Sequence, residues 1–297
     1  MYRVSGTAIM VAGLCLMLGA APGWAGGPPN NDVSDAKGNT AGGTGALVNN
    51  TAGTANTAFG DVALQNNTTG GDNTAFGFSA LQKNTTGVAN AAFGLNALQN
   101  NTTGGGNTAV GYEALPSNTT GGLNTAVGES ALASNTTGGA NTGIGEGALN
   151  RNTSGNLNAA LGNVALVFNT TGQDNTAVGY AALYNNTTSN DNTAVGLAAL
   201  ESNTTGGQNT AVGSAALQSN TGSNNIALGY LAGQALKSGS NNIYVGTNSP
   251  ATESNTIRLG QAQTRTFVAG IAGTLVQGSQ VCVSSTGQLG ICGSPAR

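Results

Sequence analysis

A single stretch decides the fold: Asn107-Thr108-Ala109-Val110-Gly111-Tyr112-Glu113-Ala114-Leu115-Pro116-Ser117-Asn118-Thr119-Thr120-Gly121-Gly122-Leu123. It is one copy of a unit whose first asparagine recurs every 17 residues, at 39, 56, 73, 90, 107, 124, 141, 158, 175, 192 and 209. Glycine follows each asparagine after four residues, Ala-Leu after seven and eight, and Asn-Thr after eleven and twelve. We number this frame from 1 (Asn107) to 17 (Leu123). Strict self-similarity of this kind predicts a repeat architecture.

The unit suits one coil of a solenoid. It is too short for a helical hairpin, and its glycines and Asn-Thr pairs are poor helix formers. We expect a strand at frame positions 1 to 4, a turn at the glycine, a second short strand at Ala-Leu, and a return turn at Asn-Thr-Thr-Gly. Asparagine and glycine tolerate left-handed backbone angles, so we expect them at the corners, with stacked asparagines in ladders. The frame predicts an all-β protein, a parallel β-solenoid of 17-residue coils.

Side-chain alternation bears on the core and on assembly. Position 4 is large and apolar from Phe59 through Val110 to Val212, which predicts a core position, whereas position 6 mixes Tyr112 with Glu129 and predicts a solvent-facing one. Neighbouring residues of a strand face opposite sides, so both sides of each coil would be apolar. We expect a homo-oligomer whose subunits share a lateral apolar seam; a monomer with exposed alanines is the alternative.

The composition indicates a narrow folded protein and argues against disorder and nucleic-acid binding. With 49 glycines, 6% charged and 4% aromatic residues, a folded chain must be narrow, with small side chains packed near the backbone. The regular apolar spacing argues against disorder. The net charge of −3 and the lack of a basic run argue against a nucleic-acid partner.

The N-terminus predicts export. Arg3, an apolar stretch at residues 8–21 and small residues before 26 are typical of a secretory signal peptide at 1–25. A membrane anchor is the alternative, although the apolar stretch is short for a span. A flexible linker at 26–38 follows.

The remaining boundaries follow the frame: eleven 17-residue repeats at 39–222, shortened terminal coils at 223–260, and a β-hairpin cap at 261–297. Cys282 and Cys292 flank a Thr-Gly turn in that cap, and folding about Gly287 would place them opposite each other. In an exported chain this pair predicts a disulfide, with two buried free thiols as the alternative.

The sequence contains no histidine, which excludes Ser-His-Asp and Cys-His catalytic sites. Without histidine, Cys282 and Cys292 are too few to complete a tetrahedral zinc site. We therefore expect no enzyme, catalytic residue, cofactor or metal. Glu129 with Glu146, and Asp174 with Asp191, stack in adjacent coils; calcium binding is less favoured for them than shared counterions. The repeated Asn-Thr-Thr sequons are assigned no function.

The motifs Asn-Thr-Ala-Val-Gly and Asn-Asn-Ile-Ala-Leu-Gly resemble the head repeats of trimeric autotransporter adhesins. Residues 255–260, 266–271 and 285–290 are similar to the stretch before the intramolecular chaperone domain of phage tail-spike-like surface proteins. The resemblance covers about residues 39 to 290 and implies a left-handed β-roll in a homotrimer. No heptad stalk, membrane-barrel segment or chaperone domain follows in this sequence.

The function expected is therefore that of an exported structural or adhesive protein, the head of a surface or extracellular fibre that attaches to a cell or matrix. The expected location is the cell surface, the outer membrane or the extracellular space, and the receptor is not specified by the sequence. A carbohydrate-binding tail-fibre-like shaft is the alternative. An ice- or crystal-binding solenoid is a third, less favoured because its paired threonines are expected in a turn.

Overall fold

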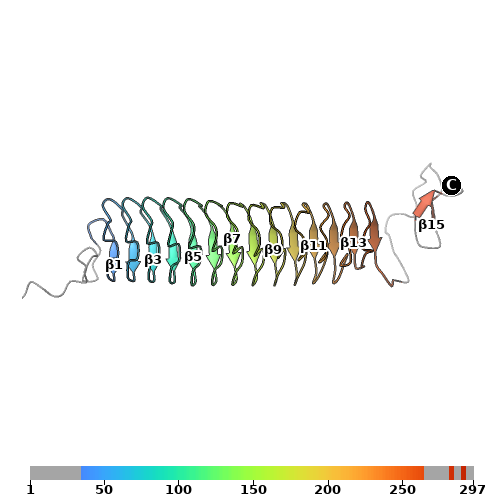
Figure 1. The fold of residues 1–297 in the computed structure, drawn as a ribbon, viewed down its shortest axis with the longest axis horizontal. Helices are drawn as coiled ribbons and strands as arrows, with labels where there is room; N and C mark the ends of the chain where they lie inside the picture. The colour runs from blue at the N-terminus through green and yellow to red at the C-terminus, as the bar shows by residue number, and fades with distance from the viewer. Residues whose placement is uncertain (1–34, 264–280, 284–288, 292–297) are drawn as a thin grey trace, which may run out of the picture. The chain divides into compact units, whose positions relative to one another are not determined.

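The computed structural model describes residues 35–263, 281–283 and 289–291. The chain divides into two units, Met1–Gln261 and Ala262–Arg297. The first holds a parallel sheet of fourteen strands stacked in sequence order (Figure 1). Its strands are β1 Thr40–Gly42, β2 Thr57–Phe59, β3 Thr74–Phe76, β4 Ala91–Phe93, β5 Thr108–Val110, β6 Thr125–Val127, β7 Thr142–Ile144, β8 Ala159–Leu161, β9 Thr176–Val178, β10 Thr193–Val195, β11 Thr210–Val212, β12 Ile226–Leu228, β13 Ile243–Val245 and β14 Ile257–Leu259.

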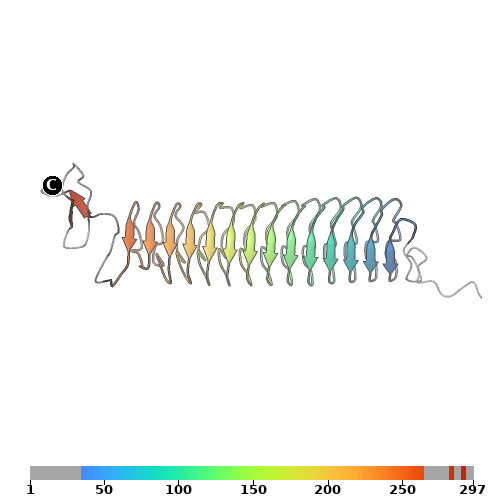
Figure 2. The same ribbon diagram turned by 180° about the vertical axis from the view of Figure 1, so that it is seen from behind.

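The register places each frame position on its own copy in the next coil. Thr108 pairs with Thr125, and Val110 with Val127. Each coil thus adds one strand to the same parallel sheet, which Figure 2 shows from behind. The expected parallel β-solenoid of 17-residue coils is confirmed. The shortened end is confirmed as well, because the offset falls to 16 residues between Thr210 and Ile226 and to 14 between Ile243 and Ile257.

The core is a narrow column of small and medium side chains. In the coil that starts at Asn107, Ala109, Ala114 and Leu115 are fully buried, and the same frame positions are buried along the stack. Close packing of so few large side chains explains how an alanine-rich sequence supports a fold without a wide hydrophobic interior.

The expected second strand at Ala-Leu is wrong. Ala114 and Leu115 lie in a turn, and both face inward because Leu115 has a left-handed φ of 55°. The leucines at this position, from Leu47 to Leu217, all have φ between 48° and 55°. A left-handed leucine costs about 1 to 2 kcal/mol, and full burial of its side chain contributes about 1.5 to 3 kcal/mol. Burial therefore offsets the backbone strain.

The expectation that asparagine takes the left-handed corners is also wrong for the repeated asparagines. Glycine at position 5 does so, with φ of 136° at Gly111. A Cβ at that residue would lie 2.7 Å from the carbonyl oxygen of Gly128 in the next coil, so only glycine fits. The asparagines contribute through their side chains.

Two buried asparagine ladders, at positions 1 and 12, tie the coils together. In the position 1 ladder, Oδ1 of Asn107 accepts from the backbone N of Asn124 at 2.9 Å and from its Nδ2 at 3.1 Å. In the position 12 ladder, Nδ2 of Asn135 donates to Oδ1 of Asn118 at 2.9 Å. Within one coil both asparagines also donate to the position 15 carbonyl, since Gly138 O accepts from Asn124 and Asn135 at 2.9 Å each. The expected ladders are confirmed, and every buried amide in them has partners.

The second unit contains two antiparallel strands, β15 Val281–Val283 and β16 Leu289–Ile291. These match the two strands of the expected cysteine hairpin.

Candidate functional site

Position 4 forms an outward row, which corrects its assignment to the core. Phe76 is 39% exposed and Val110 is 38% exposed, because the alanine at position 3 takes the inward side of the strand. Phe59, Phe76 and Phe93 stack along the row, with centroids 5.2 and 5.5 Å apart. The row continues through valine, isoleucine and leucine to Leu259 in β14. We call this row, from Phe59 to Leu259, the apolar stripe.

The apolar stripe shares its face of the sheet with position 2, which carries threonine, alanine or isoleucine in every strand. Neither position holds a charged residue between Thr40 and Leu259. Position 6, by contrast, faces solvent as expected, with Phe78, Tyr112 and Glu129 exposed. The charge-free face is therefore confined to the sheet.

The two stacked carboxylate pairs lie at the surface of the coils. The Glu146 carboxylate accepts from Nδ2 of Asn163 at 3.0 Å, and Asp174 and Asp191 are exposed. Across residues 35–263 and the two short strands, no group of three or more His, Cys, Asp or Glu side chains is placed to hold a metal ion.

The asparagines of the repeated Asn-Thr-Thr sequons are inaccessible. Asn118, for example, is fully buried, and its Nδ2 donates to Asn101 Oδ1 at 2.8 Å and Gly121 O at 2.8 Å. An amide held in this way cannot accept a glycan without breaking the ladder. The following threonine hydroxyl is also engaged, because Thr119 Oγ1 donates to Thr136 O at 3.0 Å.

The regular stack is interrupted at Ser189, which occupies position 15 in place of glycine. At the equivalent Gly155, a Cβ would lie 2.3 Å from the carbonyl oxygen of the next coil. Ser189 also enters the ladder, since its Oγ donates to Asn186 Oδ1 and accepts from Asn203 Nδ2 at 3.2 Å. Asn192 then donates to Asn190 O at 3.1 Å instead of to the position 15 carbonyl of its own coil.

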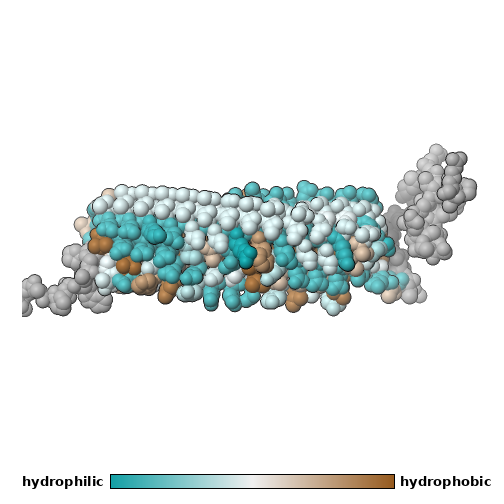
Figure 3. Space-filling model, in the orientation of Figure 1, coloured by the Kyte–Doolittle hydropathy of each residue, from teal (hydrophilic) through white to brown (hydrophobic). Residues whose placement is uncertain are grey.

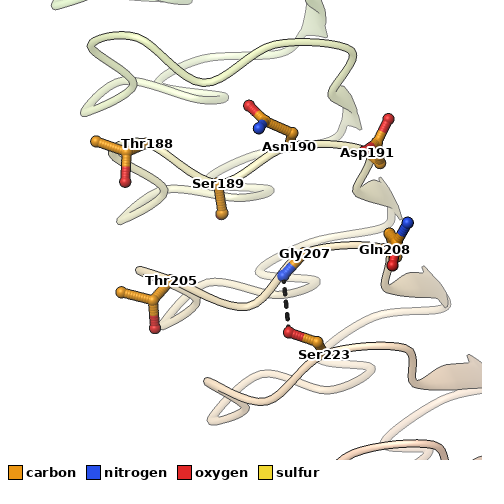
Figure 4. Close-up of a pocket in the computed structure, with 8 residues that line it drawn as sticks. All are labelled: Thr188, Ser189, Asn190, Asp191, Thr205, Gly207, Gln208 and Ser223. Atoms are coloured by element: carbon orange, nitrogen blue, oxygen red, sulfur yellow. Dashed lines mark hydrogen bonds between the residues drawn. The ribbon is translucent and has the colours of Figure 1, made fainter.

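A surface pocket of about 300 Å³ lies at this interruption. Figure 4 shows the lining residues on three successive coils, with Ser223 Oγ accepting from Gly207 N at 3.1 Å. Its lining is polar throughout: Thr188, Ser189, Asn190, Asp191, Thr205, Gly207, Gln208 and Ser223. Nothing in the repeat pattern singled out this pocket, although the substitution of serine for glycine in the frame was a visible signal.

The hairpin register places Gly290, rather than Cys292, opposite Cys282. Direct opposition of the two cysteines is therefore wrong. Cys292 lies outside the described residues, so the Cys282–Cys292 disulfide stays a prediction. Peptide mapping without reductant is expected to yield one linked fragment, and free thiols or a link between chains would refute it.

Both ends of the rod carry polar caps that the sequence did not reveal. At the first coil, Asp35 Oδ1 accepts from Asn39 N at 2.8 Å and Oδ2 from Asn39 Nδ2 at 3.1 Å. The carboxylate thus replaces the asparagine of a preceding coil. The backbone and side-chain hydrogen bonds from Asn39 lower the pKa of Asp35.

At the other end, Tyr244 takes the place of a core alanine and is fully buried. Gly233 replaces the core leucine below it, and a Cβ there would lie 2.7 Å from the Tyr244 ring. The Tyr244 hydroxyl donates to Glu253 Oε1 at 2.8 Å, and Arg258 donates to the same carboxylate from Nε and Nη2. The Arg258 hydrogen bonds lower the pKa of Glu253.

In comparison with known proteins, no family model, no curated protein and no solved structure matches this chain. Within the described part of the chain, no helix has the length and apolar character needed to cross a membrane.

Proposed function

We propose that this chain is an exported, non-enzymatic structural protein, the adhesive head of a surface or extracellular fibre, assembled as a homotrimer. The observation that supports the assembly is the apolar stripe. Hydrophobic residues scattered singly on a surface are ordinary, but an unbroken row from β2 to β14 marks an interaction surface.

The chemistry of the face fits a protein interface. Interface centres are depleted of charged residues and enriched in aromatic ones, and the sheet face carries no charge at positions 2 and 4 and three stacked phenylalanines. A second copy offers the same row at the same spacing, because every coil repeats the step of about 4.8 Å. The subunits then pack side by side along their length.

The surface away from the sheet suits presentation to another body. Figure 3 shows one face of the rod, with a pale band along its upper edge, hydrophilic side chains beneath it, and hydrophobic side chains scattered singly. Such a face repeats the same polar groups along the stack. A rigid rod that displays many equal groups gains attachment through multivalency without a deep pocket in each coil.

The mass of the secreted chain in solution tests the assembly. We expect a trimer by light scattering, with Phe76→Glu weakening it because a charge would enter the desolvated face. Phe78→Glu is the matched control, since Phe78 is 52% exposed and lies outside the apolar stripe. A monomeric parent chain, or equal effects of the two variants, would refute the proposed seam.

Small-angle scattering tests the rod. Fourteen strands at about 4.8 Å per step give a solenoid about 60 Å long. A compact sphere of the same mass would contradict it. Attachment is then tested on cells and immobilised matrix, where the assembled chain is expected to bind and the Phe76→Glu chain to bind more weakly through lost multivalency.

A further inference from the structure

The return corner of each coil is normally closed by a fan of hydrogen bonds onto one carbonyl. Thr170 O, at position 13, accepts from the backbone N of Thr153, Ser154 and Gly155 at 2.9, 3.2 and 3.4 Å. It also accepts from the Thr153 hydroxyl at 3.0 Å. The same pattern joins the earlier coils from Thr51 onward. The corner backbone of the regular rod is therefore satisfied by the adjacent coil.

This fan is missing at two successive steps. Within residues 35–263, Thr204 O accepts only the Thr187 hydroxyl, at the longer distance of 3.4 Å, and no backbone N of Thr187, Thr188 or Ser189 reaches it. The next step, from Thr204 to Thr221, has no such backbone bond either. The fan resumes between Thr221 and Lys237, with N to O at 3.1 Å.

Each gap has a cause in the sequence. The first coincides with Ser189, whose Cβ occupies space that glycine leaves to the next coil. The second coincides with a coil that is one residue shorter at this corner, Asn220-Thr221-Gly222 in place of Asn-Thr-Thr-Gly. The fan is therefore lost on both sides of Thr204, whereas the end of this corner stays bonded to both neighbouring coils: Gln208 N donates to Asn190 O at 3.1 Å, and Gly207 O accepts from Asn224 N at 3.0 Å.

Polar groups without hydrogen bonds in the described chain line the pocket, and the lost fan adds backbone N–H groups to them. The side chains of Thr188, Asp191, Thr205 and Gln208 make no hydrogen bond to another residue of the described chain. Backbone N–H groups of Thr188, Ser189 and Thr205 are likewise unbonded within it. These four side chains are exposed, and Ser189 beside them is buried. Donors and acceptors that lie together without partners favour a ligand that supplies both kinds of group.

We propose that this pocket binds one residue of a neutral saccharide. A volume of about 300 Å³ lies at the lower end of the range for small-molecule sites, about 300 to 1,000 Å³. The lining has no apolar side chain, which disfavours a lipid or aromatic ligand. Asp191 is its one charged residue, which disfavours an anion. Hydroxyl groups both donate and accept, so a sugar ring satisfies the carboxylate, the amides and the backbone N–H groups together.

This site goes beyond the proposed fibre function and is independent of it. It lies at the return corner of three coils, whereas the seam lies on the sheet face, so a change in the pocket leaves the oligomeric mass unchanged. It also occurs once in the described rod, because Ser189 is the one residue in the regular repeats from Gly53 to Gly206 that replaces the position 15 glycine.

Saturation-transfer NMR with the full chain tests the proposal, using the methyl glycosides of glucose, galactose, mannose and N-acetylglucosamine, and putrescine as a cationic probe. We expect saturable binding of at least one glycoside. Ser189→Gly, which restores the position 15 glycine and removes the Ser189 hydroxyl from the pocket, is expected to weaken binding by about tenfold or more, the loss of one or two hydrogen bonds. Asp191→Asn should weaken it in the same direction.

Asp174→Asn is the matched control, at the same frame position one coil earlier and outside the pocket. Its binding should equal that of the parent chain. Circular dichroism and light scattering verify that each variant keeps its fold and mass. Binding of none of the glycosides, binding of putrescine alone, or glycoside binding that survives both Ser189→Gly and Asp191→Asn would overturn the proposal. An equal loss in Asp174→Asn would overturn it as well.

Discussion

Removal of one rung from an asparagine ladder tests the physical account of the fold. Nδ2 of Asn124 donates to Asn107 Oδ1 at 3.1 Å and to Gly138 O at 2.9 Å. Its Oδ1 accepts from N and Nδ2 of Asn141 at 3.0 and 3.2 Å. Asn124→Ala therefore removes four hydrogen bonds from a fully buried site.

The remaining partners differ in how well they are satisfied. Gly138 O keeps the bond from Asn135 at 2.9 Å, and Asn107 Oδ1 keeps the bond from the Asn124 backbone N at 2.9 Å. The backbone N of Asn141 loses its acceptor within the described coils. At about 1 kcal/mol for each bond, the free energy of unfolding should fall by about 3 to 5 kcal/mol.

Urea unfolding followed by circular dichroism measures this change, and hydrogen exchange at β6 and β7 shows whether the loss is local, as nearest-neighbour coupling requires. Asn163→Ala is the control, because the Asn163 side chain makes one exposed hydrogen bond, to Glu146 at 3.0 Å, and its loss should change stability by less than about 0.5 kcal/mol. If Asn124→Ala costs no more than Asn163→Ala, the ladders do not hold the coils together.

Three further outcomes follow from the core and the caps. Leu132→Asp places a carboxylate in a fully buried layer and should destabilise the stack by several kcal/mol, about 3 or more, with proteolysis near that coil; unchanged melting would refute its core role. The pKa of Asp35 is lowered in the folded chain, so the ionised carboxylate should stabilise the first coil above the ordinary aspartate pKa. This stabilisation should be lost as pH falls through the folded pKa, and hydrogen exchange at β1 should then become faster. Asp35→Asn, which keeps an acceptor for Asn39, should remove this pH dependence. Arg258 likewise lowers the pKa of Glu253, so acid should reduce the protection of β13 and β14 from hydrogen exchange. Glu253→Gln should show the same reduced protection at neutral pH. If neither acid nor Glu253→Gln changes the protection, Glu253 does not stabilise this end of the stack.

The sequence predicted correctly those features that depend on the type of a single residue or on the 17-residue period. Gly111 marks a corner because a Cβ would meet the next coil, and Asn107 stacks on Asn124 because the period places them together. Position 4 was misassigned because a large apolar residue is usual in a core. In this narrow coil alanine fills the inward side, and Val110 has no room there.

The sequence by itself determined the period, the parallel stack, the ladders and the shortened end, since a 17-residue repeat leaves each residue beside its own copy. Only the tertiary structure decided which apolar residues face outward, that Leu115 adopts a left-handed turn, and that the corner opens at Ser189. Each of these depends on the cross-section of the coil. Contacts between successive coils decide which side chain fits inside the coil and which corner loses its hydrogen bonds. No single repeat contains these contacts.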